Sequence, residues 1–127
     1  CWKNRGQKMN RLQRGKKAAI KAARNSKFYA HRVGSAIFSG TRLVSLGANS
    51  HKTHPDNDCF TIHAEFSSLK KVPRDYKNLV MYVARLTRTD KVSFAKPCPA
   101  CQEKIENAGI KRCYFTDYSG HLKELVF

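Results

Sequence analysis

Two cysteines lie three positions apart in the segment KPCPAC, at Cys98 and Cys101. This spacing brings both sulfurs to the same side of a helix, where they can face one metal ion. Pro99 favours the first turn of a helix at this point. Near a helix N-terminus, the unpaired N–H groups and the helix dipole favour thiolate over thiol, and thiolate is the form that binds metal. The segment therefore predicts a pair of metal ligands.

The segment HAE, which begins at His63, supplies the other groups that such a centre needs. His63 offers a neutral nitrogen, and three protein ligands leave the fourth tetrahedral position of zinc for a water molecule, as a catalytic site requires. Glu65 is too close in sequence to His63 to coordinate comfortably beside it, but it can reach that water and carry its proton. We therefore expect one Zn²⁺ per chain, with His63, Cys98 and Cys101 as ligands and Glu65 as the catalytic acid and base.

A closed structural site is the alternative interpretation, because Cys59 lies four residues before His63. A fourth protein ligand at Cys59 would leave no position for water and would give Glu65 no role. Of the other cysteines, Cys113 falls in a predicted strand and is expected in the core, and Cys1 is expected to be incidental to the site. Five cysteines without a repetitive spacing, in a chain without a visible signal peptide, favour metal binding in a reducing compartment, the cytoplasm or nucleus.

Together the two segments match the H-x-E…P-C-x-x-C pattern of zinc deaminases. On these motifs, on a predicted β-hairpin and on the AGIKR-CYF segment, the chain resembles the zinc-dependent cytidine/deoxycytidylate deaminase superfamily over roughly residues 12–127. The resemblance implies a three-layer α/β/α fold with a five-stranded mixed sheet. It also implies hydrolytic deamination at C4 of cytosine or C6 of adenine, with release of ammonia.

The resemblance implies contacts to the substrate as well. Asn49 stands where the family places an asparagine against the sugar or base, and Ala64 and Pro97 adjoin the metal ligands at the same pocket. Asp117 and Tyr118 stand where polynucleotide cytosine deaminases grip the base 5′ to the target, and an aromatic ring there can stack on a neighbouring base. The alternatives are that Asn49 caps a turn and that Tyr118 packs on its own sheet.

The elements that must position these groups follow from the hydrophobic pattern. Helices are expected at residues 12–24, 63–72 and 99–108, and strands at 33–38, 43–46, 78–86, 111–116 and 121–127. The polar stretches 48–60 and 86–96 are expected to be loops. The fold class is therefore α/β, with a basic flexible arm at residues 1–11 and one catalytic domain at residues 12–127.

The last two expected strands determine the topology of the C-terminal end. Only residues 117–120 separate them, and four residues can close a hairpin, whereas a parallel return needs a dozen or more. We therefore expect an antiparallel final pair, which favours the cytidine-deaminase-like branch of the superfamily over the deoxycytidylate branch. The alternative is a short helix, since Leu122 and Leu125 lie three residues apart.

Positive charge is concentrated in the first part of the chain. Residues 1–55 contain 13 Lys or Arg and no acidic residue, whereas the remaining 72 contain 12 basic and nine acidic residues. A one-sided basic field attracts polyanions, most often nucleic acid, although a solubilising tail is the alternative. Isolated histidines in loops are usually polar surface. The further expected contacts to nucleic acid near the pocket are His31, Arg32, His51, Lys52 and His54.

The sequence supports several hypotheses about the substrate. Cytosine in single-stranded DNA or RNA is favoured, because it would use the acid-free first 55 residues as a binding surface. Free cytidine, deoxycytidine or dCMP is the alternative, and adenosine in transfer RNA comes third, because relatives of that kind return the last strand by a helix. A nucleic-acid-binding module with a structural zinc is the non-enzymatic alternative.

Two further expectations concern the chain as a whole. No apolar run approaches the ~20 residues that span a bilayer, so no membrane partner is expected. The chain begins at Cys1 rather than Met, which indicates a trimmed or processed fragment. Nothing in the sequence predicts an oligomeric state.

Overall fold

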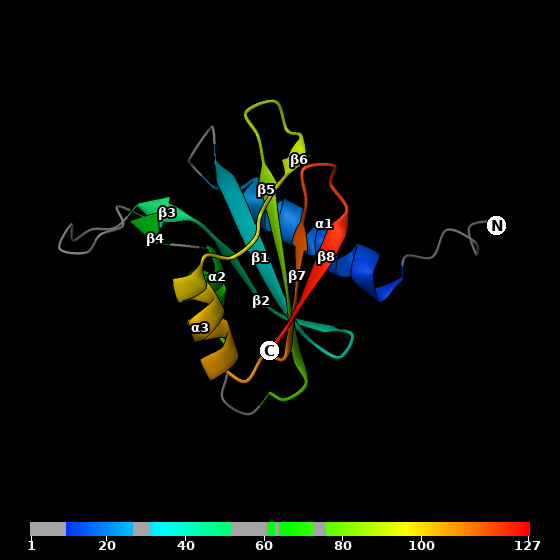
Figure 1. Ribbon diagram of the computed structural model, residues 1–127, viewed down its shortest axis with the longest axis vertical. Helices are drawn as coiled ribbons and strands as arrows, with labels where there is room; N and C mark the ends of the chain where they lie inside the picture. Colours follow the sequence, from blue (N-terminus) through cyan, green and yellow to red (C-terminus); the bar gives the residue numbers. More distant parts are fainter. Residues whose placement is uncertain (1–9, 27–30, 52–60, 63, 73–75) are drawn as a thin grey trace.

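The computed structural model describes residues 10–26, 31–51, 61–62, 64–72 and 76–127. Its elements follow one another along the chain as shown in Figure 1: α1 (Arg11–Ala23), β1 (Arg32–Ser39), β2 (Arg42–Ala48), β3 (Ser50–His51), β4 (Thr61–Ile62), α2 (Ala64–Leu69), β5 (Leu79–Leu86), β6 (Val92–Ser93), α3 (Pro99–Asn107), β7 (Arg112–Thr116) and β8 (Leu122–Val126). The three helices and five long strands confirm the predicted order, with ends that differ by a few residues.

Two segments that were expected to be loops contain short strands, which corrects the sequence-based prediction. β3 lies within residues 48–60 and pairs with β4 just beyond them, with Ser50 opposite Ile62. β6 lies within residues 86–96 and pairs with the end of β5. Because each strand is formed by pairing with a partner outside its own segment, local composition did not predict it.

The sheet has the strand order β2-β1-β5-β7-β8, with β6 added beside the end of β5. β5 and β7 run parallel, and every other neighbouring pair in this sheet is antiparallel. The prediction of a five-stranded mixed sheet with an antiparallel last hairpin is therefore confirmed. The alternative of a C-terminal helix is wrong, because β8 pairs with β7 along its whole length, from Leu122 to Val126.

Helices cover both faces of the sheet, which confirms the predicted three layers. α1 packs on one face and α2 and α3 lie on the other (Figure 1). Alternate residues of β5 serve the two faces: Tyr82 and Ala84 join the cluster under α1, whereas Met81 and Val83 join the cluster that includes Ile105 of α3. The site residues on α2 and α3 are therefore on the opposite side of the sheet from α1.

Two glycines let the helices approach the sheet closely. A Cβ atom on Gly34 of β1 would lie 2.2 Å from the carbonyl oxygen of Ala19 in α1. A Cβ atom on Gly47 of β2 would lie 2.6 Å from the carbonyl oxygen of Ala64 in α2. Real Cβ atoms do not approach backbone this closely, so only glycine permits this packing.

α1 is amphipathic and starts with a capping box. The Asn10 side chain accepts a 2.8 Å hydrogen bond from the Gln13 backbone, and the Gln13 side chain accepts one of 3.2 Å from the Asn10 backbone. The helix buries Gly15, Ala19, Ala22 and Ala23 and exposes basic side chains. Since it begins at Arg11, the last residue of the predicted arm is helical, while residues 1–9 of that arm lie outside the described part.

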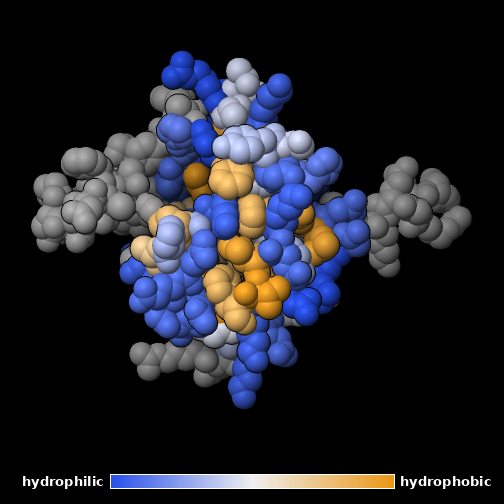
Figure 2. Space-filling model, in the orientation of Figure 1, coloured by the Kyte–Doolittle hydropathy of each residue, from blue (hydrophilic) through white to orange (hydrophobic). Residues whose placement is uncertain are grey.

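On the face shown in Figure 2, hydrophobic side chains gather near the middle, between α3 and the β7–β8 hairpin, and hydrophilic side chains surround them. Phe127 and Leu125 are partly buried against the core cluster that includes Ile105 and Cys113. Within the described residues, no helix combines the length and the apolar character needed to span a bilayer.

Candidate active site

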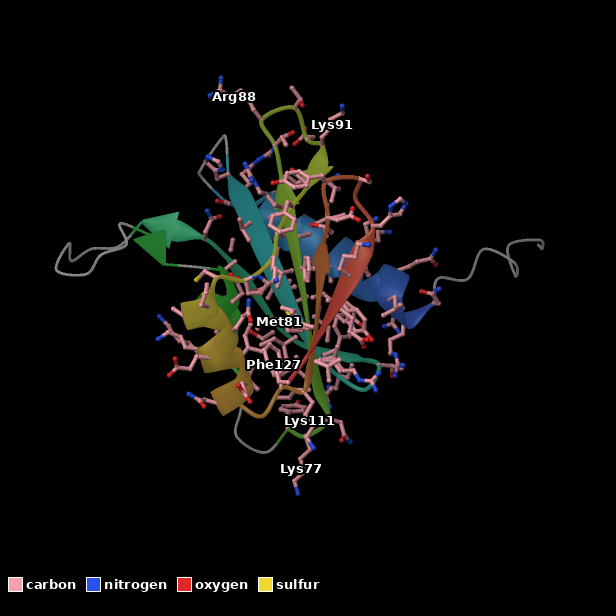
Figure 3. All side chains as sticks on the ribbon, viewed as in Figure 1. Lys77, Met81, Arg88, Lys91, Lys111 and Phe127 are labelled. Atoms are coloured by element: carbon pink, nitrogen blue, oxygen red, sulfur yellow. The ribbon has the colours of Figure 1, made fainter. Side chains whose placement is uncertain are left out.

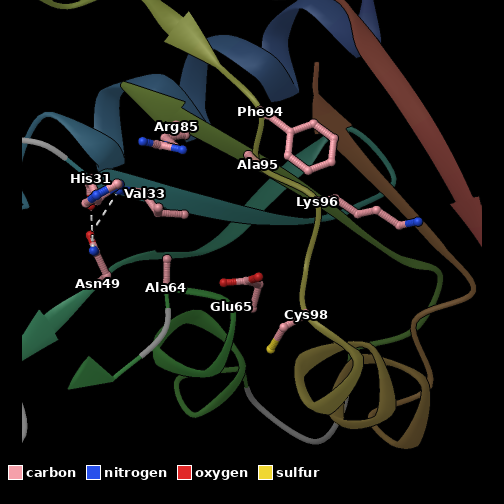
Figure 4. Close-up of a pocket in the computed structure, with 10 residues that line it drawn as sticks. All are labelled: His31, Val33, Asn49, Ala64, Glu65, Arg85, Phe94, Ala95, Lys96 and Cys98. Carbon is pink, nitrogen blue, oxygen red and sulfur yellow. Dashed lines mark hydrogen bonds between the residues drawn. The ribbon is translucent and has the colours of Figure 1, made fainter. Parts of the chain in front are cut away.

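A cavity of about 280 Å³ lies where the C-terminal half of β5 meets the first turns of α2 and α3. Its wall is formed by residues of β1, α2 and β5, by the N-cap residue of α3, and by residues that adjoin β1, β2 and β6 (Figure 4). The lining residues are His31, Val33, Asn49, Ala64, Glu65, Arg85, Phe94, Ala95, Lys96 and Cys98. Polar and charged groups from distant parts of the sequence therefore converge on one hollow.

Glu65 is the carboxylate of this cavity and is nearly enclosed by protein, with 5% of its surface exposed. Burial raises the pKa of Glu65, and a hydrogen bond to its own backbone opposes that rise in part. A buried carboxyl group with a raised pKa can both accept and donate protons near neutral pH, which a permanently ionised one cannot do as well.

Buried serines fix the short helix that carries Glu65. The Ser35 hydroxyl of β1 donates a 2.7 Å hydrogen bond to the Ala64 carbonyl oxygen and lies 2.6 Å from the Ser68 hydroxyl. The Ser45 hydroxyl of β2 donates a 2.7 Å hydrogen bond to the Ser68 carbonyl oxygen. Because α2 has only six residues, these contacts to the sheet determine its position more than its own helical hydrogen bonds do.

The two cysteines lie together at the start of α3. Cys98 is the N-cap residue in an extended conformation, Pro99 follows in the first turn, and Cys101 is buried with 4% of its surface exposed. The Gln102 backbone N–H donates a 2.8 Å hydrogen bond to the Cys98 carbonyl oxygen, and its side chain donates another of 2.8 Å to the oxygen of buried Pro97. These bonds hold the first turn and its thiols against the cavity.

The pKa of Cys101 shows how close these groups are. It is raised chiefly by burial, then by the nearby negative charges of Glu65 and Cys98, and further by a hydrogen bond with the Cys98 side chain. Glu65 also contributes to the raised pKa of Cys113 on β7, although burial is the larger cause there. Cys113 is fully buried in the core, as predicted.

This donor set fits a zinc ion. Two thiols in contact, with a carboxylate beside them, repel one another when they are ionised. A divalent cation between them would offset this repulsion and favour the thiolate forms. Paired sulfur ligands at a helix start suit zinc among the common metals. His63, the predicted third ligand, lies outside the described residues, directly before the first residue of α2, and so does Cys59 of the alternative closed site. The described residues alone contain no group of three ligands.

Residues 9–117 match the family described as the cytidine and deoxycytidylate deaminase zinc-binding region. The chain belongs to this family. Its members are deaminases with a zinc-binding region, so the predicted superfamily is confirmed. Among curated proteins, no sequence matches significantly.

Solved structures of deaminases share the fold. The cytidine deaminase from Burkholderia pseudomallei is 18% identical, with 93% of each chain covered and a TM-score of 0.68. The cytidine deaminase from Mycobacterium leprae is 20% identical, covering 91% of this chain and 94% of the other, with a TM-score of 0.61. The dCMP deaminase from the cyanophage S-TIM5 is 21% identical, with 86% of each chain covered and a TM-score of 0.57. At these identities the likeness is one of fold.

Asn49 of this deaminase-family chain lines the cavity and also joins three segments. Its Oδ1 accepts hydrogen bonds from the Val33 backbone at 3.0 Å and from the Ser26 hydroxyl at 2.6 Å, and its Nδ2 donates to the His31 carbonyl oxygen at 2.7 Å (Figure 4). An amide oxygen accepts two bonds and the NH₂ group donates two. Among the described groups, Nδ2 makes one bond, which leaves one hydrogen for a ligand.

The other expected contacts fall outside this cavity or outside the described side chains. Arg32 is largely buried and links β1 to the β5–β6 turn, through a 2.7 Å hydrogen bond to the Thr87 carbonyl oxygen and an ion pair with Asp90. The structure describes the backbone of His51 in β3 but not its side chain, and Lys52 and His54 lie outside the described residues. Of the expected nucleic-acid contacts, His31 is the one that lines the cavity.

Asp117 and Tyr118 also lie outside the wall of the cavity. The Asp117 carboxylate accepts hydrogen bonds of 2.9 Å from the backbones of Ser119 and His121, and so holds the β7–β8 turn. The Tyr118 ring, with 77% of the residue exposed, stacks on Phe94 at 4.9 Å and 10°. Phe94 lines the cavity, so Tyr118 borders the cavity through that ring.

Sequence reasoning missed three polar or aromatic residues of the cavity, Arg85, Phe94 and Lys96. One signal was present for Arg85, because it is the single charged residue in the predicted strand NLVMYVARL. Phe94 and Lys96 had no such signal, because hydrophobic and polar residues do not alternate regularly in the segment before KPCPAC, and inward positions therefore cannot be distinguished from outward ones.

Proposed function

We propose that this chain is a zinc-dependent hydrolytic deaminase that converts cytosine to uracil, with Glu65 as the proton carrier and His63, Cys98 and Cys101 as the metal ligands. The observation that supports this most is the buried Glu65 carboxylate in one cavity with Cys98, whose thiol is hydrogen-bonded to that of Cys101. Family membership supports the same reaction class. The reaction consumes one water molecule and releases one ammonia.

Zinc bound at these sulfurs would supply Lewis-acid activation of the attacking water. Glu65 would accept one proton of that water and deliver it to N3 of the ring, and would then accept the second proton from the hydroxyl group newly bonded to C4 and deliver it to the departing amine. Its position on a helix held by Ser35 keeps the carboxylate fixed while it works.

Replacement of Glu65 by Gln tests this role. We expect deamination of cytidine or CMP to fall by about 10²–10⁴-fold, because the amide cannot carry a proton, while zinc content stays near that of the wild type. The matched control is Glu103→Gln, which removes an exposed carboxylate of α3 and should leave the rate unchanged. Retained turnover in Glu65→Gln would contradict the proton-carrying role of Glu65, whereas a wild-type chain that binds zinc and turns over no substrate would favour the non-enzymatic hypothesis of a structural zinc.

We infer that the substrate is a free cytosine nucleoside or nucleotide. The basic side chains of α1 lie on the opposite side of the sheet from α2 and α3, so much of the charge that favoured a polynucleotide is not directed at the cavity. The solved relatives support the inference, since they are cytidine deaminases and a dCMP deaminase, the latter also solved in complex with dCMP and dUMP. The direct antiparallel return of β8 weighs against the adenosine hypothesis.

Cytosine in a single strand is the second candidate, and one observation favours it. A second hollow, of about 500 Å³, is lined by Lys16, Lys91, Tyr118 and His121 among others, and Tyr118 connects it to Phe94 of the first cavity. An exposed aromatic ring among cations is suited to a neighbouring nucleotide.

A comparison of substrates at low and high salt separates the two candidates. If a single strand is the substrate, an oligonucleotide should be turned over faster than CMP, and its rate should fall steeply as salt rises, because phosphate contacts release counterions. If the enzyme acts on the monomers and leaves the oligonucleotide unchanged at every salt concentration, the second candidate is excluded.

A further inference from the structure

Arg85 occupies a position that the strand pattern would give to an apolar residue. On β5, Met81 and Val83 point into the core under α3, and Arg85 is the next residue with the same orientation. It lies opposite Val33 on β1 and opposite Ser93 on β6, so its backbone is held on both sides. Val33 lines the same cavity. A guanidinium group therefore faces the cavity from a fixed position in the sheet.

The place of Arg85 in the cavity separates it from the reacting groups. In Figure 4 it lies across the hollow from Glu65 and Cys98, beside His31. If C4 of a cytosine ring is directed at Glu65 and Cys98, the sugar and its 5′ group extend toward the opposite side of the cavity, where Asn49 and Arg85 lie. Nucleoside recognition needs no cation at that end, whereas a 5′-phosphate carries up to two negative charges at neutral pH.

We propose that Arg85 binds the 5′-phosphate of the substrate and thereby selects cytosine nucleotides over nucleosides. The proposal rests on the deaminase function proposed above and names the residue that sets its specificity. A guanidinium group offers a planar pair of N–H donors that matches two phosphate oxygens. In a half-buried position it is less hydrated than a surface lysine, so the phosphate replaces less water when it binds.

Lys96 is the other cation of the cavity, but its position suits this role less. It is exposed, it lies in the segment between β6 and α3, and in Figure 4 its chain extends away from the side of Arg85 and His31. A flexible ammonium group attracts phosphate as a point charge but does not orient it. We therefore assign phosphate selection to Arg85 and only general attraction to Lys96.

The test measures kcat/KM for cytidine, deoxycytidine, CMP, dCMP and a cytosine-containing oligonucleotide. Arg85→Gln should lower kcat/KM for substrates with a 5′-phosphate by about 10- to 150-fold and leave the nucleosides within about twofold, since charged hydrogen bonds to phosphate are lost. The control is Arg88→Gln, three residues further on, which removes an exposed arginine at the tip of the β5–β6 turn (Figure 3). It should leave the ratio of kcat/KM for nucleotides to that for nucleosides unchanged.

The substrate arms identify the source of the phosphate. If Arg85→Gln lowers kcat/KM for CMP and dCMP, the phosphate that Arg85 binds is the monoester of a free nucleotide. If kcat/KM falls for the oligonucleotide alone, the phosphate is a diester within a strand. An equal loss on nucleosides and nucleotides overturns the proposal, because Arg85 would then act on the base or on the structure alone. The proposal is also overturned if Lys96→Gln abolishes nucleotide preference while Arg85→Gln preserves it.

Binding measurements keep the proposal testable if turnover is absent or if Arg85→Gln does not fold. Calorimetry on the Glu65→Gln protein should show CMP binding at least tenfold more tightly than cytidine, a difference that Arg85→Gln removes. With the wild-type chain, inorganic phosphate should weaken CMP binding more than cytidine binding. Equal affinities for CMP and cytidine would overturn the role of Arg85 in binding the phosphate. If the wild-type chain binds CMP more tightly than cytidine but deaminates neither, the result counts against the proposed reaction and not against the role of Arg85.

Discussion

The hydroxyl group of Ser35 donates a 2.7 Å hydrogen bond to the carbonyl oxygen of Ala64, the residue directly before Glu65. Both residues are fully buried, so this bond fixes the start of α2 on the central part of the sheet. The position of the Glu65 carboxylate therefore depends on a side chain thirty residues earlier in the sequence.

Replacement of Ser35 by Ala is expected to lower both stability and turnover. It leaves a buried carbonyl oxygen without this donor, which costs about 1–3 kcal/mol in the free energy of unfolding, and it releases the first turn of α2. Urea unfolding and kcat for CMP measure the two effects. The exposed Ser119→Ala variant is the control and should match the wild type. A Ser35→Ala protein with wild-type kcat would show that α2 holds its position without this bond.

Replacement of Gly47 by Ala is expected to displace α2 from the sheet. The added Cβ atom would lie 2.5 Å from the Ser68 nitrogen, and backbone cannot move aside cheaply. We expect a loss of about 1–3 kcal/mol in the free energy of unfolding together with a fall in kcat. Gly40→Ala is a useful comparison, because its cost of about 1–2 kcal/mol comes from a left-handed backbone in open space and should leave kcat unchanged. Normal kcat in Gly47→Ala would contradict the predicted displacement.

Replacement of Arg32 by Met is expected to destabilise the fold. The Arg32 side chain is 15% exposed and holds the β5–β6 turn through Thr87 and Asp90, so its loss should cost about 1.5–3 kcal/mol in unfolding free energy. Asp90→Asn should cost less than about 1 kcal/mol, because 63% of the Asp90 side chain is exposed. If Arg32→Met keeps full stability but binds an oligonucleotide less tightly, the nucleic-acid contact expected from the sequence is supported instead.

The Asp117 carboxylate is expected to make stability depend on pH in the acid range. Hydrogen bonds from the backbones of His121 and Ser119 lower the pKa of Asp117 below its ordinary value of 3.8, the His121 bond most. A lowered pKa in the folded state stabilises the fold above pH 3.8, and that contribution is lost as the pH falls through the folded value. The stability difference between wild type and Asp117→Ala, measured by urea unfolding, should therefore shrink below about pH 4. A difference that is independent of pH would contradict this role.

Features that depend on short stretches of chain could be predicted from the residues alone. The Cys98–Cys101 pair lies at a helix start because three residues make one turn and Pro99 favours the first turn. The last hairpin is antiparallel because four residues cannot carry the chain back across the sheet. The strand at residues 78–86 and the place of Cys113 in the core were also expected from local composition.

Which side chains share the cavity, and which partners each one contacts, depends on how distant segments pack together. Asn49 is bonded to Ser26, Val33 and His31, and Tyr118 stacks on Phe94, and the sequence predicted none of these contacts. Arg85 faces Glu65 across the hollow because strand pairing sets its register and a helix from another part of the chain covers that face. Periodicity within a segment fixes which side of an element a residue takes, whereas the neighbour it meets there depends on contacts between segments that no local pattern encodes.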